Sequence, residues 1–171
     1  MLRRKFMSLA LAGVIGITSI FSVGCGGFIA SLKTAIASSG PLLSVLVNKK
    51  VLSQEKADFI RSDFNAAVDV VAELDKDFKA ATNTGDKLAA AQKAERAWKA
   101  IYAQGHFGAN ATILEVANIV DAVFASVVAY YGGGPRASLT SRSGARIDSE
   151  EALAQHVKER AERIKELLKV K

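Results

Sequence analysis

A run of apolar residues between positions 54 and 81 constrains the fold more than any other feature of the sequence. The apolar positions follow one another in alternating steps of three and four: Ala57, Ile60, Phe64, Ala67, Val71, Leu74 and Phe78. This heptad spacing places all of them on one face of an α-helix. Charged residues occupy the remaining faces: Asp58, Arg61, Asp63, Asp69, Glu73, Lys76 and Lys79. A helix with a single apolar stripe must bury it against other helices, so the segment predicts a bundle or coiled-coil arrangement.

Five other segments have helical periodicity, and turn signals separate them. We expect helices over residues 28–38, 42–48, 86–104, 110–131 and 149–169. No segment alternates apolar and polar residues between turn signals as a strand does. The sequence therefore predicts an all-α fold, a small antiparallel helical bundle with three to four main helices plus two short N-terminal helices packed on them. The last helix either completes a four-helix bundle or stays apart on its linker.

Three helix starts have recognisable caps. Ser53 precedes the first long helix and is a good N-cap. Thr112 with Glu115, and Asp148 with Glu151, have the three-residue spacing of a capping box, in which two side chains satisfy free backbone donors. These pairs predict where the last two helices begin. Asn110-Ala111-Thr112 also matches a glycosylation sequon, although capping explains the same residues.

The first 24 residues have the order of a secretory signal peptide. Arg3, Arg4 and Lys5 form a basic start, an apolar run extends over residues 6–23, and small residues stand at positions 22 and 24. We expect cleavage after residue 24. The basic start supplies half of the net charge of +6, and the weak excess that remains does not predict a nucleic-acid partner.

Ser22-Val23-Gly24-Cys25 resembles a bacterial lipobox, the site at which a lipoprotein signal peptidase cuts before a lipid-modified cysteine. Leu is usual where Ser22 stands. The resemblance implies diacylglycerol on the Cys25 sulfur and an added palmitate-type acyl chain on the new amino terminus. Two or more chains anchor a protein stably to a bilayer. The alternatives are a cleaved signal with a free Cys25 and an uncleaved signal anchor. Arg3-Arg4-Lys5-Phe6-Met7 is also similar to a twin-arginine export motif, although an ordinary basic start explains it.

These signals divide the chain into five parts. We expect a signal peptide over 1–24, a lipid-anchored tether over 25–27, a helical bundle over 28–131, a Gly/Ser/Arg-rich linker over 132–147, and a charged amphipathic helix over 148–171. The predicted location is the bacterial cell envelope, on a membrane that the domain faces from the periplasm or the exterior.

Residues that could support chemistry are few. The sequence has two histidines, His106 and His156, and a single cysteine, so we expect no catalytic group, no metal site and no cofactor. Glu115, Asn118 and Asp121 form a polar stripe on an otherwise apolar helix, which predicts either its solvated face or a buried polar site. The residues that we expect to be available for interaction are Trp98, His106, Arg136, Arg142 and Arg146.

Three functions remain open at this point. The leading hypothesis is an envelope lipoprotein, not an enzyme, that acts as a structural or interaction module with an unidentified protein partner and could form oligomers. The second is a small-ligand or ion-binding module with an interior cavity lined by Trp98, Tyr102, Phe124 and Asp121. The third is a membrane-active protein that inserts residues 113–131, which are long enough to span a bilayer.

Overall fold

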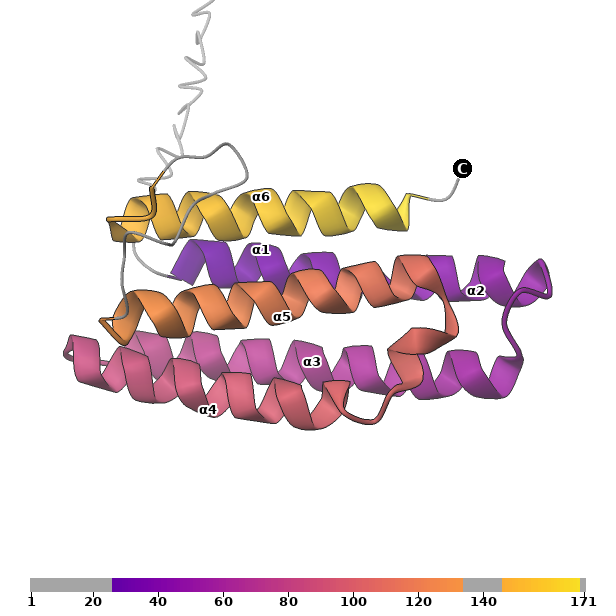
Figure 1. Ribbon diagram of the computed structural model, residues 1–171, viewed down its shortest axis with the longest axis horizontal. Coiled ribbons are helices and arrows are strands. Elements are labelled where there is room, and N and C mark those ends of the chain that lie inside the picture. Colours follow the sequence, from indigo (N-terminus) through magenta and orange to yellow (C-terminus); the bar gives the residue numbers. More distant parts are fainter. Residues whose placement is uncertain (1–25, 134–145, 170–171) are drawn as a thin grey trace, which may run out of the picture.

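The computed structural model describes residues 26–133 and 146–169, and these form helices and no strand. The all-α class is therefore confirmed. The elements are α1 (Gly26–Ala37), α2 (Gly40–Asn48), α3 (Gln54–Ala80), α4 (Thr84–Tyr102), the short 3₁₀ helix η1 (His106–Ala109), α5 (Ala111–Tyr131) and α6 (Glu150–Leu168). Figure 1 shows the long helices side by side along one direction, with α2 continuing the line of α1.

Five helices make a closed ring of contacts. α1 packs on α3, α3 on α4, α4 on α5, α5 on α6, and α6 on α1. Each helix of the ring therefore has two neighbours that cover its apolar stripe. The seven residues of the predicted seam on α3 are all buried, which confirms the heptad interpretation.

The directions of the helices follow from this ring. Short connections reverse the chain between α3, α4 and α5, so these neighbours are antiparallel. An odd number of helices cannot alternate around a closed ring, and one neighbouring pair must run the same way. That pair is α1 and α6, whose first residues lie at the same end of the molecule (Figure 1).

One feature of the predicted architecture changes, and one alternative that the sequence left open is decided. α1 is a full member of the ring, between α3 and α6, and not a short helix added to a finished core. α6 packs on α5 and α1 and does not stand apart on its linker. Its buried residues follow the helical period: Leu153, His156, Val157, Ala161, Ile164 and Leu168.

The predicted helix starts are correct for α3 and shifted for the last two helices. Ser53 Oγ accepts a hydrogen bond from the Lys56 amide, as expected. The predicted capping box at Thr112 is wrong, because Asn110 Oδ1 accepts from the amides of Thr112 and Ile113 at 3.0 and 3.3 Å. Asn110, two residues earlier, has the extended backbone that an N-cap requires, and its side-chain oxygen accepts the bonds.

The Asp148 capping box is wrong by one residue. Ser149 Oγ accepts from the Ala152 amide at 3.1 Å and is the N-cap of α6. At the other end of α5, Gly133 adopts a φ of +67°, a left-handed conformation that glycine tolerates better than residues with a Cβ. The predicted signal peptide, Cys25 and residues 134–145 of the predicted linker lie outside the described residues.

Candidate functional site

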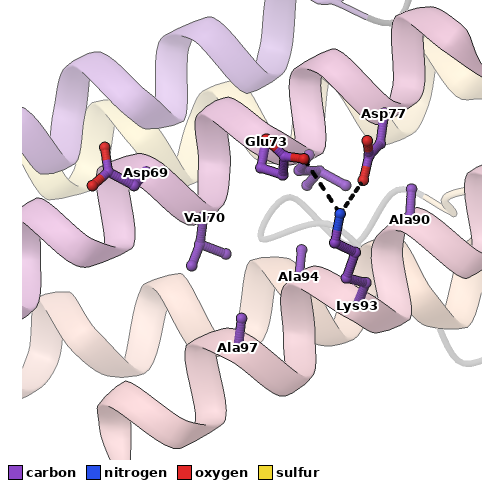
Figure 2. Close-up of a pocket in the computed structure, with 9 residues that line it drawn as sticks. Asp69, Val70, Glu73, Asp77, Ala90, Lys93, Ala94 and Ala97 are labelled. Atoms are coloured by element: carbon purple, nitrogen blue, oxygen red, sulfur yellow. Dashed lines mark hydrogen bonds and ion pairs between the residues drawn. The ribbon is translucent and has the colours of Figure 1, made fainter.

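A groove runs along the outside of the molecule between the second half of α3 and the middle of α4. Its volume is about 320 Å³, near the lower limit for ligand sites. Figure 2 shows the two helices and the side chains between them, which come from Asp69, Val70, Glu73, Leu74, Asp77, Ala90, Lys93, Ala94 and Ala97. We call these nine residues the α3–α4 groove.

The groove exists because α4 presents small side chains to α3. Ala90, Ala94 and Ala97 recur at steps of three and four on the groove side of α4. Ala90 and Ala94 are buried, so the two helices approach closely along this line. Because an alanine methyl group fills little space beyond the backbone, a hollow with an apolar floor remains between the two helices on the outer side.

Three carboxylates form one edge of the groove. Asp69, Glu73 and Asp77 follow one another at steps of four, which places them on one face of α3. Lys93 reaches across from α4, and its Nζ donates to Asp77 Oδ2 at 2.9 Å and to Glu73 Oε1 at 3.4 Å. These bonds, chiefly the one to Asp77, raise the pKa of Lys93 above its ordinary value. The lysine therefore stays charged at neutral pH.

Asp69 differs from the other two acids. It is exposed, and it has no ion-pair partner among the residues that the structure describes. In Figure 2 its carboxylate lies one helical turn from Glu73, away from the dashed bonds of Lys93. The groove thus has one carboxylate edge with a single cation across it.

A second hollow continues the groove beyond Lys93. It shares Asp77, Ala90 and Lys93 with the first hollow and adds Asp86, and its volume is about 330 Å³. Hydrogen bonds from the Thr82 backbone and hydroxyl lower the pKa of Asp86, so this carboxylate is charged as well. Lys93 therefore lies between two hollows with an acidic lining, and the whole surface favours a cationic ligand with apolar contacts.

The structure places His106, an expected interaction residue, near the surface at the start of η1. Its Nδ1 lies 2.8 Å from Oδ2 of Asp63, and its ring stacks on Phe59 with the centroids 5.0 Å apart. Sequence reasoning placed Asp63 on an outer face of its helix, which is wrong, because η1 covers it and leaves it 4% exposed. Phe59 and Asp63 are the residues at this position that the sequence reasoning missed.

Trp98, the second expected residue, is fully buried. Its ring packs against Phe107 and Phe124, and its Nε1 donates to Asp121 Oδ1 at 3.2 Å. The predicted ligand cavity around Trp98, Tyr102, Phe124 and Asp121 is occupied by these aromatic contacts. Trp98 therefore connects α4 to α5 within the core.

The polar stripe on α5 is neither simply solvated nor an ion site. Asp121 accepts from Trp98, and Asn118 Oδ1 accepts from the Tyr102 hydroxyl at 2.6 Å. Glu115 Oε1 accepts from Nη2 of Arg163 on α6 at 3.0 Å. All three residues thus connect α5 to its two neighbours in the ring, which fixes the register of the most apolar helix.

The remaining expected residues have less structural support. Arg146 is exposed, whereas Cys25, Arg136 and Arg142 lie outside the described residues. Within the described ranges, 26–133 and 146–169, no group of three or more His, Cys, Asp or Glu residues could hold a metal ion.

Two segments of the described chain are long and apolar enough to cross a membrane. They are Gly27–Asn48, which comprises α1 and α2, and Ala111–Tyr131, which is α5. About two fifths of each segment is buried inside the protein. This is weak evidence for membrane insertion, because the core helix of a water-soluble protein passes the same test.

Comparison with known proteins finds no matching family model, no matching curated protein and no matching solved structure. The chemistry of the groove and of the helix surfaces therefore carries the functional argument.

Proposed function

We propose that this chain is a lipid-anchored envelope protein whose antiparallel helical bundle docks a cationic segment of a partner protein in the α3–α4 groove. The observation that carries the proposal is the lining of the groove, with three carboxylates on one edge and an alanine-rich floor. Such a surface fits an amphipathic helix that has Lys or Arg beside its apolar stripe, as in other helix-in-groove interactions.

Lys93 illustrates the kind of group that the groove accepts. Its ammonium group donates hydrogen bonds to Glu73 and Asp77. The Lys93 side chain extends from the alanine-rich face of α4 (Figure 2). Asp69 offers a further carboxylate one turn away. A partner helix with two cations at a spacing of four residues would match Asp69 and Glu73.

The docking proposal is tested with a designed peptide of known sequence. We expect an amphipathic helical peptide with Lys at positions i and i+4 to bind the full chain, purified in detergent, and calorimetry measures its dissociation constant. The double variant Asp69→Asn/Glu73→Gln should weaken binding about tenfold, because two charge contacts are lost. A peptide with Glu in place of Lys should not bind.

The matched control is Glu55→Gln/Asp58→Asn, which removes two exposed carboxylates from the same helix but outside the groove. This variant should retain the affinity of the native chain. If both double variants weaken binding equally, the peptide responds to net charge and the groove has no specific role. If neither weakens it, the carboxylate edge does not bind the peptide.

The anchor is tested separately on the native protein. Mass spectrometry of the membrane fraction should find a mature amino terminus at Cys25 that carries diacylglycerol and an acyl chain. A Cys25→Ser variant should be released from the membrane by carbonate, since one acyl-modified residue provides the attachment. An unmodified amino terminus would refute the anchor, and retention of the serine variant would support insertion of an apolar segment instead.

A further inference from the structure

A second pocket, at the other end of α3, has a lining of a different kind. It lies between the first two turns of α3 and the 3₁₀ helix η1, and its volume is about 320 Å³. Its lining residues are Lys56, Phe59, Gly105, His106, Gly108 and Ala109. We call it the α3–η1 pocket. It shares no residue with the α3–α4 groove, so the inference below does not depend on the proposed function.

The η1 side of the pocket is open because its residues are small. Gly105 has a φ of +78°, a left-handed conformation that favours glycine, and it ends the chain reversal after α4. A Cβ added to Gly105 or Gly108 would meet no heavy atom within 4 Å. The backbone therefore forms this wall of the pocket and leaves room for a ligand.

His106 is held in one orientation before any ligand arrives. The buried carboxylate of Asp63 lies 2.8 Å from Nδ1 and is the natural acceptor of the Nδ1 proton. Phe59 stacks on the ring with an interplanar angle of 17°. Nε2 is on the opposite edge of the imidazole from Asp63, and one third of the side chain is exposed. The free edge of the ring is thus available to a ligand.

The charges around the pocket favour an anion. Lys56 is a cation, and no carboxylate is among the lining residues. Asp63 is directed to Nδ1 of His106. Asp58, an exposed acid that precedes Phe59 in the sequence, bonds Arg61 and Gln54 on its own helix. A bound anion would therefore meet the Lys56 ammonium group without a competing carboxylate in the lining.

Phe59 adds an apolar surface. Its side chain is 47% exposed, and Val51 is the other exposed large hydrophobic residue in the described part of the chain. An aromatic ring left half in water at the edge of a pocket is a contact surface for a planar or apolar group. The ligand should therefore combine a negative charge with a planar apolar body.

We propose that the α3–η1 pocket binds a small aromatic carboxylate. The carboxylate accepts from the ammonium group of Lys56, and the aromatic ring of the ligand packs on Phe59 beside His106. Asp63 acts as a positioning residue that holds the imidazole, and it does not touch the ligand.

Benzoate is the probe, with benzamide as its neutral isostere and acetate as the carboxylate without a ring. We expect benzoate to shift the amide NMR signals of Gly105 and Gly108 in the full chain, purified in detergent. Benzamide should bind at least tenfold more weakly, because it lacks the charge. Equal binding of benzamide and benzoate, or the absence of shifts at these glycines, would overturn the proposal.

Two exposed positions separate the roles of charge and ring. Lys56→Gln should weaken benzoate binding at least fivefold, whereas Lys76→Gln, an exposed lysine on the same helix outside the pocket, should leave it unchanged. Phe59→Leu should weaken benzoate binding and leave acetate binding unchanged. Equal losses in the two lysine variants would assign the effect to net charge, and an equal loss of acetate in Phe59→Leu would refute ring packing.

Discussion

The α3–α4 groove and the α3–η1 pocket both use α3 and have the same volume, about 320 Å³, but their linings have opposite charge preferences. Asp69, Glu73 and Asp77 line the edge of the groove beside the alanines of α4, and only Lys93 reaches across to them. At the other end of the helix, η1 covers Asp63, and its charge is directed to His106. The difference shows that what packs against a helix decides whether its carboxylates attract a ligand or position another side chain.

The largest effect should come from Phe107→Ala, which would destroy one site and spare the other. Phe107 is buried and packs η1 onto Phe64, Trp98 and Tyr102. Its truncation should lower the free energy of unfolding by about 3–5 kcal/mol, as measured by urea denaturation. Benzoate binding should be lost while the lysine peptide still binds.

Phe107→Leu provides the milder version of this test. It keeps most of the apolar volume and should cost about 1 kcal/mol, so that both sites remain formed. If the alanine variant stays folded and loses the peptide as well, the two sites are coupled through the core and the comparison between them fails.

A smaller effect is expected from Lys93→Ala, which should strengthen binding of the lysine peptide. This change removes the cation that lies across the groove, so a cationic peptide no longer competes with it for Glu73 and Asp77. We expect the peptide to bind several-fold more tightly, with little change in stability because exposed ion pairs contribute little. Lys99→Ala, which removes an exposed lysine of the same helix that pairs with Glu95 outside the groove, is the control. Weaker binding in Lys93→Ala would mean that Lys93 itself contacts the partner.

The smallest expected effect is on the pH dependence of folding stability. It arises from His156, which belongs to neither the α3–α4 groove nor the α3–η1 pocket. Burial, and secondly the nearby charge of Arg160, lower the pKa of His156 on α6. Its Nδ1 is buried without a hydrogen-bond partner, and Nε2 lies 3.5 Å from Ser126 Oγ. The folded chain therefore binds a proton less readily at this position than the unfolded chain, in which a histidine has a pKa of about 6.5.

The sign of the effect follows from linkage. Between the folded pKa and about 6.5 the unfolded state holds more protons, so stability is full above this window and falls as the pH falls through it. Urea denaturation at several pH values measures the loss, and His156→Gln should reduce it. An unchanged pH dependence in that variant would assign the effect to other groups.

The sequence predicts most of the helices, because periodicity records which face of a helix is buried. The seam of α3 is correct at every position from Ala57 to Phe78. Helix starts are less predictable, since Asn110 and Ser149 compete with nearby residues that could also cap. Residue spacing alone does not show which of several neighbouring polar residues is the N-cap. The backbone conformation before each helix decides this.

The candidate sites were harder to predict for a physical reason. Asp69, Glu73 and Asp77 are visible as a charged row at helical spacing, but the hollow beside them depends on the alanines of another helix. Asp63 is on a different face of α3, three residues after Ile60 and four before Ala67, so the helical period places it beside the buried seam. That η1 covers it and that His106 is its partner depend on tertiary packing, which no pattern within α3 contains.

The parallel pair that closes the ring has a consequence for how the chain folds. α1 is the first helix of the described chain and α6 is the last, so the contact between them joins the most distant parts of the sequence. Contacts of large sequence separation form slowly, because the loop between them must first be ordered. We therefore expect α3, α4 and α5 to assemble early as a local unit. An emerging chain would leave one side of α1 uncovered until α6 is synthesised.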